Sequence, residues 1–143
     1  MTLATQIPVV IGVGDLKNRS TRLEDAFEPL DLMVQAISVA LQDTGLSSES
    51  AQSLQQMVDS ISIVANWTWP YPNTPKLLRD KLKCRATYLH ESEHGGHSPA
   101  ELFDEAARRI AHGHSKVAVV TGGEALASCK TQSLSTGDSL VPG

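Results

Sequence analysis

Short apolar runs rich in β-branched residues alternate with longer segments of helical periodicity, and this alternation constrains the fold more than any other feature. The runs span residues 7–13, 60–65, 86–90 and 116–120. Short runs of this kind between turn residues are typical of strands buried in a sheet. Strands that alternate with helices favour parallel pairing, because each crossover is long enough to hold a helix. The sequence therefore predicts an α/β fold with a mostly parallel sheet and helices on both faces.

Two of the connecting segments carry helix signals. From Pro29, apolar residues recur at spacings of three and four as far as Leu41, and Gly45 follows where a helix would end. Thr74 precedes Pro75 and a short leucine-rich stretch, which predicts a second helix with Thr74 as its N-cap.

A third helix is indicated near the end of the chain. Ser98-Pro99-Ala100-Glu101 matches a capping box with proline at the first helical position, so Ser98 is the expected N-cap. One apolar face follows, and Gly113 marks the end of the helix.

Composition excludes several classes of function. A chain of 143 residues fits one domain, and its net charge of -4 provides no basic surface for nucleic acid. No apolar run is long enough to span a membrane, and no secretory signal is present, so a cytoplasmic location is expected. Cys84 and Cys129 lie far apart without a CxxC spacing, which indicates reduced thiols rather than a disulfide framework.

The C-terminal residues depart from this pattern. Residues 129–143 (CKTQSLSTGDSLVPG) are rich in Ser, Thr and Gly and show no helical or alternating period. We expect one domain over residues 1–128 and a disordered tail over residues 129–143.

The stretch HESEHGGHSP, residues 90–99, holds three of the five histidines. His90, Glu91 and His94 meet the HExxH spacing of zinc hydrolases, but that chemistry requires one helical face, and Gly95-Gly96 interrupts any helix. A polar loop is the favoured interpretation, no metal site is predicted, and a metal-dependent hydrolase remains an alternative.

The same turn has a second chemical interpretation. Gly95-Gly96 lies directly before a helix start, where free backbone N–H groups and the helix dipole favour an oxyanion. No Walker lysine or GxGxxG motif accompanies it, so a nucleotide site is not indicated. Trp67, Trp69 and Tyr71, interleaved with prolines, are predicted to form a loop packed on the core rather than a ligand groove.

With these residues in view, the chain resembles the N-terminal half of a thiolase-superfamily protein, in the branch of thiolase-like acetyl-CoA acetyltransferases related to sterol-carrier-protein thiolases. Three stretches carry the resemblance, which extends over about residues 6–128: IPVVIGVGD, WTWPYPNTPKLL and SEHGGHSPAELFDEAARRIAHGHSKVAVVTGGEAL. It implies an acyltransferase that makes or breaks carbon–carbon bonds beside a thioester, with acyl-CoA as substrate and no further cofactor.

The resemblance also identifies the place of the nucleophile. Thiolases mount a cysteine ten residues before the first alanine of the Ala106-Ala107 pair, and that position here is Gly96. His97 and His94 flank it as candidate proton carriers. Ser98, like Cys84, is a candidate for acylation if covalent chemistry survives, although its capping role is favoured.

The resemblance to a half molecule has consequences of its own. A whole thiolase subunit has two similar halves, and its catalytic histidine and second cysteine belong to the C-terminal one. We therefore expect a truncated gene product without turnover of its own, with apolar surface left uncovered around the helix from Ser98. A homo-oligomer or a complex with a thiolase-like partner is expected, and a non-catalytic interaction module is the alternative function. Full-length relatives are compatible with a peroxisomal location, although no Ser-Lys-Leu signal is present.

Overall fold

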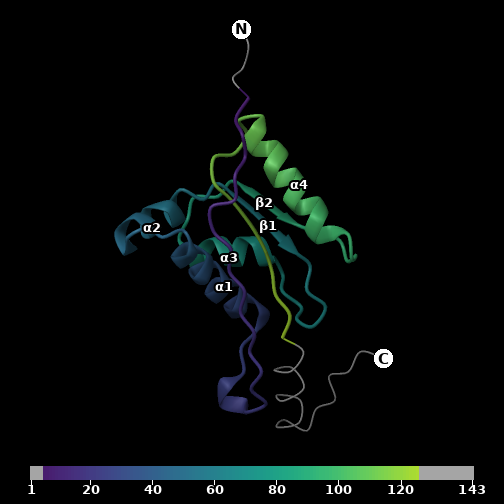
Figure 1. The fold of residues 1–143 in the computed structure, drawn as a ribbon. Coiled ribbons are helices and arrows are strands. Elements are labelled where there is room, and N and C mark those ends of the chain that lie inside the picture. The colour runs from purple at the N-terminus through teal and green to yellow at the C-terminus, as the bar shows by residue number, and fades with distance from the viewer. Residues whose placement is uncertain (1–4, 126–143) are drawn as a thin grey trace.

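The computed structural model of the protein describes residues 5–125, so the expected tail at 129–143 lies outside the described residues. Figure 1 shows a small sheet between helices. In chain order the elements are η1 (Leu23–Asp25), α1 (Pro29–Asp43), α2 (Ser48–Gln56), β1 (Ser60–Val64), α3 (Thr74–Leu82), β2 (Tyr88–Glu91), α4 (Ser98–Ala111) and β3 (Ala118–Gly122).

The sheet has three strands in the order β2-β1-β3, and both pairings are parallel. The central strand β1 places Ser60 opposite Tyr88 on one side and opposite Ala118 on the other. A helix connects each strand to the next, as parallel pairing requires. The predicted α/β class and the parallel sheet are confirmed.

The two faces of β1 carry different side chains because successive residues of a strand point to opposite faces. Ile61 and Ile63 are fully buried in a cluster with side chains of α1 and α3. Ser60 and Ser62 are also buried but alternate with them, and therefore face α4. Small side chains on this face let α4 pack closely on the strand through Ala106. Helices thus cover both faces of the sheet, as expected.

The helix predicted from Pro29 is α1, and its buried residues Leu30, Met33 and Ile37 follow the expected spacing. Beyond it, Gly45 adopts a left-handed backbone with φ of 73°, which favours glycine. Gly113 does the same after α4 with φ of 75°. Both helix ends therefore fall where the glycines predicted them.

The two predicted N-caps are wrong by one position. Asn73 caps α3, because its side chain accepts a hydrogen bond from the Lys76 amide at 3.1 Å, while Thr74 is the buried first residue of the helix. Ser98 is likewise the first residue of α4, and His97 occupies the cap position without a side-chain hydrogen bond. In both places the Pro that follows lies at the second helical residue.

Residues 7–13 contradict the prediction of a buried strand. The segment is extended and belongs to no sheet, and its apolar side chains, Pro8 and Gly12 apart, are 53 % to 84 % exposed. We name it the N-terminal segment. Its hydrogen bonds lie at its ends: just before it, Gln6 N donates to Ala111 O at 3.3 Å, and at its last residue Val13 N donates to Asp43 Oδ2 at 2.9 Å. In Figure 1 it runs, in purple, alongside β3.

The location of exposed apolar surface also differs from expectation. On α4 only Phe103 is a large exposed apolar residue among those described, whereas such residues gather along the N-terminal segment. Within residues 5–125, no helix is both long and apolar enough to cross a membrane.

Candidate functional site

Three loops meet at the carboxyl edge of the sheet, because parallel strands all end there. In α/β proteins this edge is the usual place for a ligand. The loops after β1 and β2 are joined by Ser92, whose amide donates to Ile63 O at 2.9 Å and whose hydroxyl accepts from Ala65 N at 3.1 Å. The turn residues 92–97 and the start of α4 are therefore held against the end of β1.

The loop after β3 is tied to the loop after β1 by Glu124. Its two carboxylate oxygens accept hydrogen bonds from the Trp67 amide and, at 2.8 Å, from the Thr68 hydroxyl. The Trp67 side chain is 73 % exposed, and its ring lies 3.9 Å from the ring of His94, centroid to centroid. Trp67 therefore covers the turn rather than packing on the core, contrary to the prediction for this loop.

The prediction holds for Tyr71, at the far end of the same loop. Its side chain packs against the core cluster, and its hydroxyl accepts a hydrogen bond from Leu30 N at 3.1 Å. The aromatic residues of one loop thus have two different environments.

Two adjacent glycines form the turn before α4, and they differ in the space around them. A Cβ at Gly95 would lie 2.7 Å from Cε1 of His97, so a side chain there would displace the imidazole. A Cβ at Gly96 would meet nothing within 4 Å, and the residue is exposed. Position 96 therefore has room for a side chain at the start of a helix.

Backbone donors accompany this open position. Ser98 N donates to Gly95 O and Glu101 N to His97 O, both at 3.1 Å, whereas the Ala100 amide has no hydrogen-bond partner among the described residues. Free amides and the positive end of the helix dipole favour negative charge near position 96. The expected oxyanion-favouring helix start is consistent with this geometry.

The candidate side chains around position 96 differ in their exposure to solvent. His94 and His97 are exposed, and His97 Nε2 lies 3.6 Å from Glu101 Oε2. Ser98 is buried and donates its hydroxyl proton to the Glu93 carbonyl at 2.9 Å. The two histidines are accessible to solvent or a ligand, while Ser98 holds the turn against α4.

A small hollow of about 320 Å³ lies beside this turn. Leu16, Leu32, Pro99 and the end of β3 line it, together with the acidic residues Asp15 and Glu124. No Lys or Arg lines it among the described residues. Its polarity suits a neutral or cationic group better than a phosphate.

The three residues of the HExxH pattern, His90, Glu91 and His94, do not point toward a common site. His90 and Glu91 are adjacent on β2, so they point to opposite faces. Glu91 accepts a hydrogen bond from the Thr74 hydroxyl at 3.1 Å, and His94 stacks on Trp67. In residues 5–125, no three His, Cys, Asp or Glu side chains come close enough to hold a metal ion.

Tyr88 on β2 lies on the α4 side of the sheet and has a shifted pKa. Burial raises the pKa of its hydroxyl, and the hydrogen bond to the Glu105 carboxylate raises it further. The Arg109 guanidinium lies 3.6 Å from the centre of the Tyr88 ring and acts in the opposite direction. Tyr88 therefore remains a neutral hydrogen-bond donor at physiological pH.

The thiol that the structure describes is not at the site. Cys84 follows α3 and precedes β2, at the opposite edge of the sheet, and packs partly buried against the core. It has the structural environment predicted for it, and Cys129 lies outside the described residues.

Sequence reasoning did not identify Glu124 or the pairing of Trp67 with His94. A signal was present, since Trp67 follows β1 by three residues and Glu124 follows β3 by two. Polar and aromatic residues directly after parallel strands share one edge of the sheet.

Comparison with known proteins gives one kind of match. No protein-family model matches the chain, and neither does any curated protein. Among solved structures, the chain is similar to a monomeric SCP2-thiolase-like protein type 1 from Mycobacterium smegmatis, with a TM-score of 0.64 and 22 % identity. The match covers 78 % of this chain and 22 % of the other, so the chain spans about a fifth of that protein's length. The likeness shows a thiolase-like fold.

Proposed function

We propose that this chain belongs with the thiolase-like acyl-CoA acyltransferases and lacks their covalent step. One observation carries the proposal: position 96 is an open, exposed place at the start of α4, and it holds a glycine. The resemblance to thiolases puts the nucleophilic cysteine at this position. A residue with no side chain there cannot form an acyl-enzyme.

The surroundings of position 96 support the same interpretation. The free Ala100 amide and the dipole of α4 would lower the pKa of a thiol placed there and stabilise a developing oxyanion. His94 and His97 lie on the same turn and are exposed. The turn therefore retains a favourable environment for a thiolate without the thiolate itself.

The substrate class follows only from the family likeness, since no Lys or Arg among the described residues lines the hollow to bind the phosphates of coenzyme A. The hollow beside α4 is lined by carboxylates, which repel phosphate. We propose that the acyl thioester end would approach the turn and that the nucleotide end would contact other parts of a complete enzyme. The chain by itself is then without turnover.

Intact-protein mass spectrometry with acetyl-CoA and longer acyl-CoAs tests this proposal. The wild-type chain is expected to show no acyl adduct, whereas Gly96→Cys is expected to gain one acyl group. The reason is that the thiolate fraction rises when a thiol lies at a helix N-terminus. Native mass spectra recorded in parallel measure noncovalent binding of the same acyl-CoAs.

Two control variants make the result specific. Gly96→Ser places a side chain of similar size at position 96 without a thiol, and Met57→Cys places an exposed thiol away from the site. An acyl adduct on wild-type Ser98 or Cys84 would overturn the proposal. Equal acylation of Gly96→Cys and Met57→Cys would contradict the assignment of position 96.

A further inference from the structure

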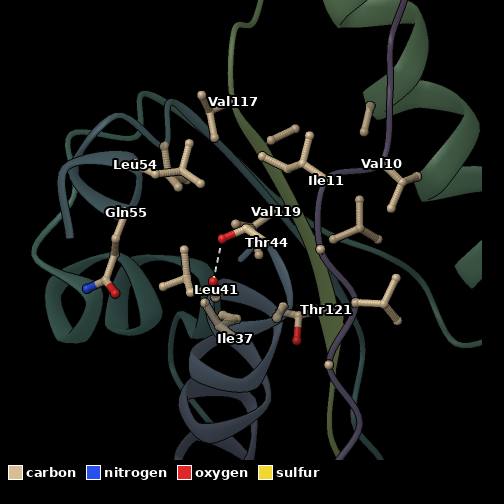
Figure 2. A pocket seen from close by; sticks show the side chains of 18 of the residues that line it. Val10, Ile11, Ile37, Leu41, Thr44, Leu54, Gln55, Val117, Val119 and Thr121 are labelled. Carbon is tan, nitrogen blue, oxygen red and sulfur yellow. Dashed lines mark hydrogen bonds between the residues drawn. The ribbon is translucent and has the colours of Figure 1, made fainter. Parts of the chain in front are cut away.

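The N-terminal segment and β3 are separated by an apolar groove of about 530 Å³ (Figure 2). Residues 8–14 form one wall and residues 117–121 the other. α1 closes one face through Ala36, Ile37 and Ala40, and α4 closes the opposite face through Phe103, Ala106 and Ala107. No Asp, Glu, Lys, Arg or His is among the described residues that line it.

Both long walls of the groove carry unpaired backbone groups. β3 pairs only with β1 among the described strands. Asp59 N donates to Val117 O at 3.0 Å, so the backbone carbonyl of Val117 points toward β1. Because backbone N–H and C=O groups alternate between the two edges of a strand, those of Ala118 and Val120 point toward the groove. No hydrogen bond joins residues 7–12 to β3 in the part of the chain that the structure describes.

An uncharged lining together with unpaired backbone groups favours an extended polypeptide, rather than an apolar small molecule, as the occupant of the groove. A fatty acyl chain would cover the amide and carbonyl groups of both walls without pairing them, and a backbone group that is buried without a hydrogen bond weakens binding. An added strand would pair with β3 on one side and with the N-terminal segment on the other, as in β-strand addition. Its side chains would alternate between the α1 face and the α4 face.

The N-terminal segment itself has the properties of such a strand. Residues 7–13 are IPVVIGV, with no charged side chain and with three consecutive β-branched residues at positions 9–11. Its apolar side chains are mostly exposed, and no backbone–backbone hydrogen bond involves residues 7–12 in the part of the chain that the structure describes. Uncharged, exposed edges of this kind pair with other chains.

We propose that the groove receives the N-terminal segment of a second copy of this chain. Reciprocal exchange gives a closed twofold dimer, in which each segment lies between the partner's β3 and the partner's own segment. The order across the interface is β3, the partner's segment, the chain's own segment, and the partner's β3. Each segment then has a neighbour on both sides, and both grooves are filled.

The proposal does not depend on any acyl-CoA chemistry. It rests on the backbone edges and the uncharged lining of the groove, and no residue of the turn 92–97 lines that groove. Loss of one proposal therefore leaves the other in place.

Sedimentation velocity across a range of concentrations measures the association. The wild-type chain is expected to form a dimer, and Ile11→Lys is expected to weaken it at least about tenfold, because the lysine would be buried in the interface. In Figure 2, Ile11 lies toward Val119 on the groove side of the segment. Met57→Lys is the matched control, since Met57 is similarly exposed and does not line the groove.

Hydrogen exchange distinguishes strand insertion from nonspecific apolar contact. In the dimer, the amides of residues 9–12 and of Ala118 and Val120 are expected to gain protection together. A synthetic peptide of residues 5–15 (TQIPVVIGVGD) is expected to bind and to compete with dimer formation, and a scrambled peptide is not. A wild-type monomer at all concentrations would overturn the proposal. A dimer whose new protection falls on β2 instead would overturn it as well.

Discussion

β1 and the N-terminal segment are both short, uncharged and rich in β-branched residues, yet only β1 is a strand. β1 (SISIV) has a parallel neighbouring strand on each side, and helices α1 and α3 pack against its isoleucines. The N-terminal segment (IPVVIGV) has the more apolar sequence, and no backbone–backbone hydrogen bond involves residues 7–12 within the part of the chain that the structure describes. An apolar β-branched run thus specifies extended backbone, but a strand also requires a partner edge.

The two regions are expected to differ most in how much an isoleucine contributes to the free energy of unfolding. Ile61 in β1 is fully buried, so Ile61→Ala is expected to lower the free energy of unfolding by about 2–5 kcal/mol. Ile11 in the N-terminal segment is half exposed, and Ile11→Ala is expected to change it by about 0.5 kcal/mol or less. Urea unfolding of both variants below the dimerisation concentration measures the difference. Similar losses would show that the segment is part of the core.

The next largest effect concerns two glycines, Gly14 directly after the N-terminal segment and Gly96 in the turn before α4. A Cβ at Gly14 would collide with Ala36 O on α1, where the end of the segment packs against the helix. Gly14→Ala is therefore expected to cost about 1–3 kcal/mol through a forced backbone shift. Gly96→Ala has free space around the new methyl group and is expected to change stability by about 0.5 kcal/mol or less. Chemical unfolding of the pair checks the contrast, and a neutral Gly14→Ala would contradict the close packing.

These contrasts explain which parts of the fold the sequence could predict. The run SISIV, the apolar spacing from Pro29 and the glycines at positions 45 and 113 predicted β1, α1 and two helix ends, because local pattern and tertiary packing agree there. Strands β2 and β3 were predicted about two residues early. The error is small because register depends on pairing, which a single strand's sequence does not contain.

The failures have physical reasons as well. The N-terminal segment was predicted as a buried strand because composition cannot show whether a partner edge exists. Helix α2 (Ser48–Gln56) was not predicted, since it buries no residue and has little apolar pattern, although Ser47 caps it by accepting from Ser50 N at 3.2 Å. At the site, the turn at Gly96 was found from local sequence, whereas the contact of Trp67 with His94 depends on two loops that only the sheet brings together.

A third prediction concerns the loop that holds the end of β1 to α1. Burial of Tyr71 raises the pKa of its hydroxyl to about 12, with the Leu30 hydrogen bond acting in the opposite direction. The folded state therefore keeps this proton to higher pH, while the unfolded chain loses it around the ordinary tyrosine pKa of 10.0. Stability is fully present below that value and is expected to fall as pH rises toward about 12, because the unfolded state then binds fewer protons.

Unfolding free energy measured between neutral pH and pH 12 checks this expectation. In Tyr71→Phe the unfolding free energy is expected to fall less steeply over the same pH range. The part of the fall that is due to the raised pKa of Tyr88 is expected to remain. An unchanged slope in Tyr71→Phe would show that the hydroxyl is as accessible to solvent as in the unfolded chain.

The smallest effect is expected where the N-terminal segment is tied to α1 by a single exposed hydrogen bond. Val13 N donates to Asp43 Oδ2 at 2.9 Å. Asp43→Ala removes the acceptor, but it also removes a carboxylate from the C-terminal end of α1, where the helix dipole disfavours negative charge. The two contributions offset one another, so global stability is expected to change by about 0.5 kcal/mol or less.

Local behaviour is expected to change even though global stability does not. Exchange of the Val13 amide should become faster in Asp43→Ala, whereas the amides of β1 should keep their protection, because the two regions open independently. Asp104→Ala removes a comparable exposed carboxylate, paired with Arg108 and distant from the segment, and serves as the control. Faster exchange in both Val13 and β1 would mean that the segment supports the sheet, and the distinction between a paired strand and an unpaired one would then lose its basis.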